Sequence, residues 1–424
     1  MATQHLAVEA IEKPRHEINR SSLIAAFGIW IGFLLGVNAL VSSTNSNFLA
    51  ALPDALGASR TAVSGALASS VWLVAVLLPI SGRIMDRYGV RAVILPGAVL
   101  FGAVYLAMSQ MHALWHYYAL QALLAVAVAM YGSLGFAKLI SLWFDRHRGL
   151  MLGLCVAFGA GLGQTIMPQV SRWMIDSYGW RGGYVGIALI VLILAFPLLF
   201  IFARPPGPSQ ESLEFAPGEA PKIVERIGLL PSEAIRTPTF YLIVAAIMLG
   251  SLSLIATLQH AVPMLLERGF DKGLATTAMS CAFFGVIIGE FTTGFLVDRL
   301  NTPKIIIPYF VAALGGLLVV HSTTNASLLL PGAVFMGMGM GCEVGLNAYL
   351  ISRYFGLKSF GALYGMSSAA SNFGIGLGVL AMGYIRDHFG SYHNTVYLVG
   401  CTMSLSLLCV LFLGPFRYSR SSKA

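Results

Sequence analysis

Residues 82–91 form a charged segment between two long apolar runs and read Gly82-Arg-Ile-Met-Asp86-Arg87-Tyr-Gly89-Val-Arg91. A shorter copy follows another apolar run in the second half of the chain and reads Gly294-Phe-Leu-Val-Asp298-Arg299. Equivalent charged loops at matching places indicate a duplicated chain with two similar halves.

Apolar residues dominate the sequence on both sides of this segment. Of 424 residues, 57% are hydrophobic and 10% are charged, whereas about 25% of a soluble domain is charged. A bilayer core of about 30 Å needs about 20 apolar residues as a helix. Runs of this kind cover 23–49, 62–82, 91–110, 114–142, 149–172, 181–203, 238–263, 274–296, 303–322, 326–351, 359–385 and 392–415. The sequence therefore predicts an all-α membrane protein with twelve transmembrane helices in two six-helix halves.

The polar segments predict the domain boundaries and the orientation. We expect an N-terminal tail at 1–22, a six-helix bundle at 23–203, a proline-rich linker at 204–237, a second bundle at 238–415 and a tail at 416–424. With the tails and the linker in the cytoplasm, the segments on that side contain nineteen Lys and Arg residues, and those on the other side contain six. Positive residues favour the cytoplasmic side, so both termini are expected there.

Composition and motifs also limit which partners and cofactors we expect. The net charge of +8 comes from short loops rather than from one face of a soluble domain, so we expect no nucleic-acid partner. All five cysteines lie in apolar runs without a CxxC pair, which argues against disulfides and a metal cluster. We expect no cofactor, because no nucleotide-binding loop or nucleophile–base spacing is present. The lipid bilayer is the expected surrounding, and a single twelve-helix chain is expected to work as a monomer.

The segment 82–91 matches the pattern GxxxDRxGxR, and over nearly its whole length the chain resembles the major facilitator superfamily. Within it, the chain looks most like the bacterial monocarboxylate-transporter and oxalate/formate-antiporter branch. The residues that carry this likeness are Trp143-Phe144-x-x-x-Arg148-Gly149, Ser352-Arg353-Tyr354-Phe355-Gly356 and Phe360-Gly361-Ala362-Leu363-Tyr364-Gly365. The resemblance implies the major facilitator fold, secondary transport across a bacterial inner membrane, and a conformational latch at Gly82, Asp86, Arg87, Gly89, Arg91, Asp298 and Arg299.

The chain departs from this branch where acid-binding residues are expected. The resemblance would place basic residues in the eighth and eleventh helices. The eighth run instead contains Glu290, and the middle of the eleventh offers Ser367, Ser368, Ser371 and Asn372. The dicarboxylate site of the branch therefore cannot be carried over.

Three ionisable residues fall inside apolar runs rather than in the loops between them: Lys138, Glu290 and Glu343. A charge at mid-bilayer costs at least about 2.5–3.5 kcal/mol, so each is a candidate functional residue. The resemblance implies that the fourth helix lines the central cavity, so Lys138 could bind an anionic substrate. Alternatively, Lys138 extends to the cytoplasmic interface or pairs with another residue.

Glu343 lies among glycines in the tenth run, one helical turn from Asn347. A carboxyl group away from water favours its neutral form and can exchange a proton, so we predict proton coupling. Pairing with Lys138 and a purely structural hydrogen bond remain the alternatives. Glu290 is a second proton-coupling candidate, although stabilising a neighbouring helix end is the favoured role.

Other polar residues of the apolar runs are candidates for substrate binding, with hydrogen bonding between helices as the alternative. They are Asn38, Ser42, Asn45, Tyr131, Gln164, His260, Asn347, Ser368 and Asn372.

These features predict a secondary active transporter of a small organic anion, with a monocarboxylate as the expected class. Transport would follow alternating access, by proton symport or anion exchange, so a small carboxylate and protons are the expected partners. The alternative is proton-driven efflux of apolar or cationic compounds. A membrane enzyme or a sensor is the remaining class, and no sequence feature supports it.

Overall fold

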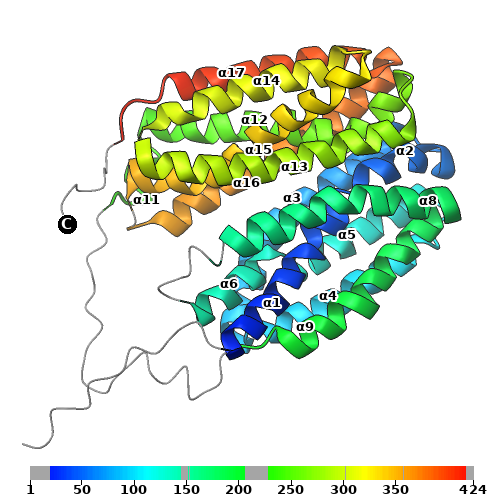
Figure 1. Ribbon diagram of the computed structural model, residues 1–424, viewed down its shortest axis with the longest axis horizontal. Helices are drawn as coiled ribbons and strands as arrows, with labels where there is room; N and C mark the ends of the chain where they lie inside the picture. Colours follow the sequence, from blue (N-terminus) through cyan, green and yellow to red (C-terminus); the bar gives the residue numbers. More distant parts are fainter. Residues whose placement is uncertain are drawn as a thin grey trace, which may run out of the picture.

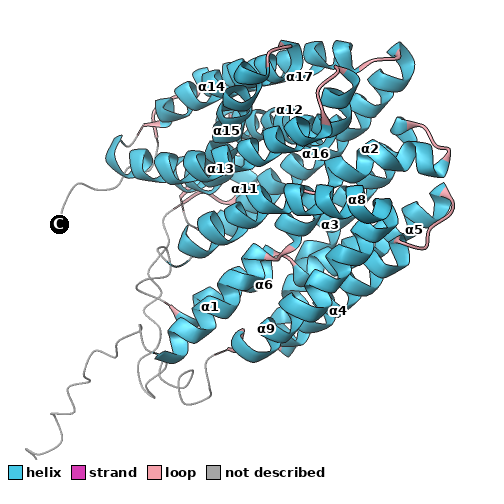
Figure 2. Cartoon of the chain, turned by 45° about the vertical axis from the view of Figure 1, so that its right-hand side comes forward, coloured by secondary structure: helices cyan, strands magenta, loops and turns pink. Residues whose placement is uncertain are grey.

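The computed structural model describes residues 20–144, 151, 153–205, 228–300, 302–356 and 358–416. Within these ranges, Figure 2 shows a chain built of helices. Eleven of its helical stretches are long and apolar enough to cross a membrane. One of them, Leu154–Phe202, includes most of the fifth and the sixth predicted runs. The backbone leaves helical geometry between the two runs at Gly179, where φ is 71° and ψ is 175°. The prediction of an all-α membrane protein is confirmed.

Two bundles of helices lie side by side (Figure 1). The first contains α1 (Arg20–Leu34), a π-helical turn (Asn38–Ser42), α2 (Asn45–Leu56), α3 (Arg60–Tyr88), α4 (Arg91–Met108), α5 (Leu114–Tyr131), α6 (Ser133–Trp143), a π-helical turn (Leu154–Ala160), α8 (Gly161–Leu189), a π-helical turn (Ile190–Ala195) and α9 (Phe196–Phe202). The second contains α11 (Pro231–Ala234), α12 (Pro238–Glu267), α13 (Lys272–Leu300), a 3₁₀ turn (Pro303–Ile305), α14 (Ile306–Ser322), α15 (Ala326–Phe355), α16 (Phe360–Phe389), a 3₁₀ turn (Tyr392–Asn394) and α17 (Thr395–Leu411).

The predicted tails and linker fall mostly on residues 1–19, 206–227 and 417–424, which lie outside the described residues. We call the end of the bundles where α3 and α15 finish and where α4 and α12 begin the linker end. There Leu229 N–H donates to the Phe355 carbonyl at 2.8 Å. The other end, where α2, α12 and α16 finish, we call the distal end.

Helices α13 and α15 pack closely within the second bundle because both carry glycines on the shared face. A Cβ at Gly289 would overlap the Met338 carbonyl, and one at Gly337 would overlap the Ala282 carbonyl. Small residues let two helix backbones approach, which is how helices gain packing energy when lipid is as apolar as their side chains. This seam fixes the position of α15, which contains Glu343.

The first apolar run is a broken helix rather than a continuous one. Helix α1 ends at Leu34, and a π-helical turn leads into α2. Tyr131 donates from its hydroxyl to the Leu35 carbonyl at 2.9 Å, and Tyr105 donates to the Leu40 carbonyl at 3.3 Å. Broken helices persist in a membrane where neighbours satisfy the freed backbone groups. Tyr131 thus belongs to the buried core and supports the break.

Hydrogen bonds between the bundles gather at the distal end. Ser46 Oγ accepts from Val262 N–H at 2.8 Å, and Thr276 donates from its hydroxyl to Asn47 Oδ1 at 3.2 Å. Further polar contacts across this end join Lys272 to Asp176, Gln169 to Thr277, and Arg60 and Thr61 to Asp387. The two bundles are therefore fastened together at their distal end.

Candidate functional site

A cavity of about 400 Å³ lies between the bundles, with walls from both. Most of its wall is apolar. Its polar side chains are Asn38, Ser42, Asn45, Ser70 and Gln164 from the first bundle and Gln259, Glu290, Ser371 and Asn372 from the second. The structure thus brings together six of the sequence candidates around one space: Asn38, Ser42, Asn45, Gln164, Glu290 and Asn372.

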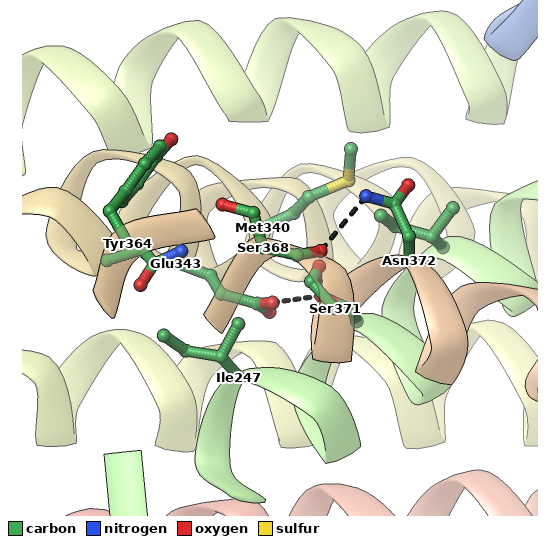
Figure 3. Close-up of a pocket in the computed structure, with 10 residues that line it drawn as sticks. Ile247, Met340, Glu343, Tyr364, Ser368, Ser371 and Asn372 are labelled. Atoms are coloured by element: carbon green, nitrogen blue, oxygen red, sulfur yellow. Dashed lines mark hydrogen bonds between the residues drawn. The ribbon is translucent and has the colours of Figure 1, made fainter. Parts of the chain in front are cut away.

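A smaller pocket of about 200 Å³ adjoins this central cavity and shares with it the wall residues Ile255, Met340, Ser371 and Asn372. Figure 3 shows the Glu343 side chain running along this pocket toward Ser371. We call it the Glu343 pocket. Its other polar walls are Ser251, Asn347, Tyr364 and Ser368.

The Glu343 carboxyl connects three helices. Only 7% of Glu343 is exposed. Ser251 of α12 donates from its hydroxyl to Glu343 Oε1, and the Ser251 Oγ also lies 2.7 Å from the Ser371 Oγ of α16. Glu343 Oε2 packs against the backbone of Gly250 and has no hydrogen-bond partner among the described residues. One carboxyl group therefore links α15 with α12 and, through Ser251, with α16.

Asn347 and Asn372 extend this polar patch. Asn347 lies one turn beyond Glu343 on α15 and accepts a hydrogen bond from Ser367 at 2.8 Å. Asn372 donates from Nδ2 to the Ser368 carbonyl at 2.9 Å (Figure 3). These bonds hold the two amides at the edge of the space while leaving further donor and acceptor capacity.

The charged side chains among the described lining residues are acidic. They are Glu343 and Glu290, and no Lys, Arg or His stands among the described residues that line the cavity and the pocket. A buried charge without a partner is costly. A negative charge on Glu343 would therefore be uncompensated in this arrangement, whereas a proton on the carboxyl removes the cost.

Lys138 lies elsewhere. It forms an ion pair with Asp86 in a hollow at the linker end whose wall also includes Leu142 and Pro205. The side chains of Lys138 and Asp86 are 30% and 71% exposed. The structure thus joins Lys138 to the predicted latch and does not bring it to the central cavity, and its role in anion binding stays a prediction.

The other latch residues contact their own bundle. Gly89 ends α3 with φ of 85°, Arg87 lies over the Tyr88 ring at 5.3 Å, and Arg91 donates to the Phe200 carbonyl and covers its ring. Gly82 packs beside Leu134 of α6. In the second half, Arg299 lies over the Phe295 ring at 4.1 Å, while the side chain of Asp298 is outside the described residues.

His260 is fully buried beside the cavity rather than in its wall. Its Nδ1 lies 3.0 Å from the Tyr392 hydroxyl, and its Nε2 lies 2.9 Å from the Val379 carbonyl. The adjacent Gln259 faces the cavity. Ser251 is a wall residue that the sequence candidates omitted, although Ser251, Ile255 and Gln259 repeat every four residues and so share one face of α12.

This arrangement of two helical bundles around a shared polar cavity can be compared with known proteins. The model of the Major Facilitator Superfamily matches residues 31–356 and 241–424. The chain belongs to the Major Facilitator Superfamily. It is therefore a membrane transporter rather than an enzyme, as the sequence predicted. The family model spans both halves and the loop at 82–91 that carried the resemblance.

Two curated relatives are similar to this transporter at low identity. Monocarboxylate transporter 13 of Bos taurus is 24% identical over 336 residues, which cover 76% of this chain and 73% of the relative. The oxalate:formate antiporter of Oxalobacter formigenes is 24% identical over 363 residues, 82% of this chain and 80% of the relative.

A solved structure supports the fold. A bacterial homologue of the human lysosomal transporter Spinster, solved in an inward-facing and unoccupied conformation, superposes with a TM-score of 0.71 at 13% identity. The match covers 93% of this chain and 96% of the other. The fold is thus that of a major facilitator transporter.

Proposed function

We propose that this transporter moves a small organic anion, of the monocarboxylate class, together with a proton that Glu343 carries. The observation that carries the proposal is the buried Glu343 carboxyl, which lies beside the central cavity without a cation in the described lining. The similarity to monocarboxylate transporter 13 and to the oxalate:formate antiporter supports the class of cargo.

The proton couples to the anion through charge. An anion entering a cavity that already contains a charged Glu343 would meet a like charge with nothing to offset it. Protonation makes the pocket neutral, and the amides of Asn347 and Asn372 can then donate hydrogen bonds to a carboxylate. The anion binds well only to the protonated protein, so the two ions move together. Glu290, which also lines the cavity, is a second proton-coupling candidate.

The orientation in the membrane, the conformational state and the oligomeric state belong to the same proposal. With the linker end in the bacterial cytoplasm and the distal end fastened, we infer a conformation that faces the cytoplasm. Rocking of the bundles would then expose the cavity to the other side. One chain supplies both walls of the cavity, which suits a monomer. In the state that faces outward, Asp86, Asp298 and their neighbours would form the latch that the resemblance implies.

Uptake into proteoliposomes tests the proposal. A monocarboxylate should accumulate when the lumen is alkaline, and an uncoupler should abolish accumulation. Glu343→Gln keeps an acceptor for Ser251 but cannot release a proton, so it should lose accumulation and retain exchange of labelled for unlabelled acid. Glu290→Gln is the matched variant of the second carboxyl. Equal uptake with and without the gradient in wild type would overturn proton coupling.

A second function is favoured by the acidic lining itself. A cavity whose acidic side chains lack a basic partner among the described residues also suits export of cationic or neutral compounds in exchange for protons. In the same vesicles, an inward proton gradient would then expel a cationic compound while leaving carboxylates undisturbed. That outcome would replace the anion proposal.

A further inference from the structure

A buried amide lies in the distal part of the central cavity. Gln259 is 8% exposed and lines the cavity, and its Oε1 has no hydrogen-bond partner among the described residues. An unmade hydrogen bond at a buried acceptor destabilises the protein. Gln259 is therefore an acceptor for which a bound molecule can supply the missing donor.

The neighbours of Gln259 fix its direction. His260 is held by Tyr392 and Val379, two residues that are not part of the cavity wall as described. Val262 N–H donates to Ser46 of the first bundle, so this stretch of α12 is also fixed across the interface. These bonds set the rotation of α12 and leave the Gln259 amide at the cavity wall.

Asn45 supplies a second amide from the opposite bundle. It precedes Ser46, the residue that accepts from Val262, and its side chain lines the same cavity. Both amides thus lie just inside the contact that fastens the distal end. Because they come from different bundles, opening that end would separate them, and a molecule that bridges them would favour the closed distal end.

From this geometry we propose that Gln259 and Asn45 form a subsite for an uncharged group of the cargo that both donates and accepts hydrogen bonds, a hydroxyl or a carboxamide. Each amide offers one acceptor and one donor group, which is the complement of such a group. The subsite contains no charge to pair with an ionic group.

The subsite extends the proposed function and rests on it, because it describes the far end of an acid whose carboxylate occupies the Glu343 pocket. Ser251 and Gln259 are eight residues apart on α12, about 12 Å along its axis. A short acid with a hydrogen bond at each end can span this interval. The cargo would be a monocarboxylate with a hydroxyl or carboxamide at its other end.

Thermal unfolding of the purified full-length protein with a matched set of acids tests this inference. The set is butyrate, 4-hydroxybutyrate, succinamate and 4-aminobutyrate, with 1,4-butanediol as the compound without a carboxylate. The hydroxy acid or the amide acid should bind about five- to tenfold more tightly than butyrate, the gain expected of one added hydrogen bond. Which of the two binds more tightly distinguishes a hydroxyl from a carboxamide.

Variants of Gln259 and Asn45 test whether the subsite causes this difference in affinity between the acids. Gln259→Leu and Asn45→Leu should reduce the preference for the hydroxy or amide acid over butyrate to less than about twofold. Gln110→Leu makes the same substitution at a surface glutamine outside the cavity and should keep the preference. The variants also report folding, because butyrate must still stabilise them.

The outcomes separate the two proposals. Equal stabilisation of wild type by butyrate and its hydroxy and amide analogues would overturn the subsite and leave the proposed function intact. A preference for 4-aminobutyrate would also overturn it, since that group is charged. If no acid stabilises the protein but butanediol does, and Gln259→Leu abolishes the effect, the subsite stands and the anion proposal falls. No stabilisation by any of these compounds would overturn both.

Discussion

At the scale of single residues, Ser251 and Glu343 depend on each other. Ser251 gives the buried carboxyl its hydrogen bond, and the second carboxyl oxygen has no partner among the described residues. Sequence spacing alone placed Glu343 and Asn347 on one face of a helix. It could not indicate that a serine ninety-two positions earlier would meet that carboxyl, because this contact depends on how α12 and α15 pack.

Ser251→Ala should destabilise the protein by about 1–2 kcal/mol, because it leaves a buried carboxyl oxygen without its donor. Thermal unfolding measures the loss. Ser69→Ala is the matched control, since Ser69 bonds the Ala66 carbonyl of its own helix, and it should cost less than half as much. Equal losses for the two variants would show that the Ser251–Glu343 contact contributes nothing specific.

Lys138→Met separates the two roles considered for this lysine. The structure pairs Lys138 with an exposed Asp86 outside the cavity lining, and exposed ion pairs contribute about 0–1 kcal/mol. We expect a small change in stability and unchanged stabilisation by a bound carboxylate, measured in the same melts. If the carboxylate no longer stabilised a folded variant, Lys138 would be an anion-binding residue after all.

At the scale of elements, the α13–α15 seam holds the second bundle together. The Asp387 carboxylate of α16 caps the start of α3, because it accepts hydrogen bonds from Arg60 and Thr61. The sequence shows glycines around Glu343, and the structure identifies the α13 backbone that packs against Gly337 and Gly341. The cap was not predictable, because Asp387 is 326 positions away from Thr61, which it contacts.

Gly337→Ala should destabilise the protein by about 1–3 kcal/mol, since a Cβ there overlaps the Ala282 backbone and the helices must move apart. Gly315→Ala, on α14, is the control because a Cβ at Gly315 meets nothing within 4 Å. Thermal unfolding compares the two. A stable Gly337→Ala variant would mean that the seam tolerates separation.

Asp387→Asn should loosen the distal end. The Asp387 carboxylate accepts from Thr61 N–H at 2.7 Å, from the Thr61 hydroxyl at 2.6 Å and from Arg60 N–H at 3.3 Å, and so caps α3 from the other bundle. A carboxylate at a helix N-terminus is stabilising, and losing charged hydrogen bonds should favour the open distal end about tenfold or more.

Distances between spin labels placed on the distal ends of the two bundles measure this shift in population. Asp54→Asn is the control, because Asp54 is an exposed carboxylate of the same end. An unchanged distance distribution in Asp387→Asn would remove the cap from the closing mechanism.

At the scale of the whole molecule, the charge bias of the loops predicts the orientation in the membrane. In whole cells, a cysteine introduced at Gln110 should react with a reagent that cannot cross the membrane, whereas one introduced at Arg83, at the linker end, should react only after the membrane is opened. The unsubstituted protein, with its five native cysteines, gives the background. Labelling in the reverse order would place the linker outside the cell.

The sequence by itself determined the class of the protein, its membrane-spanning runs and its family, because these depend on composition, run length and a local loop pattern. It also identified Glu343 and Glu290, since a carboxyl in an apolar run is anomalous without any knowledge of neighbours. The tertiary structure alone decided which helix faces meet. It gave Lys138 a partner at the linker end, placed Gln259 rather than His260 at the cavity wall, and set Ser251 against Glu343, because such contacts join residues far apart in the chain and depend on small rotations of packed helices.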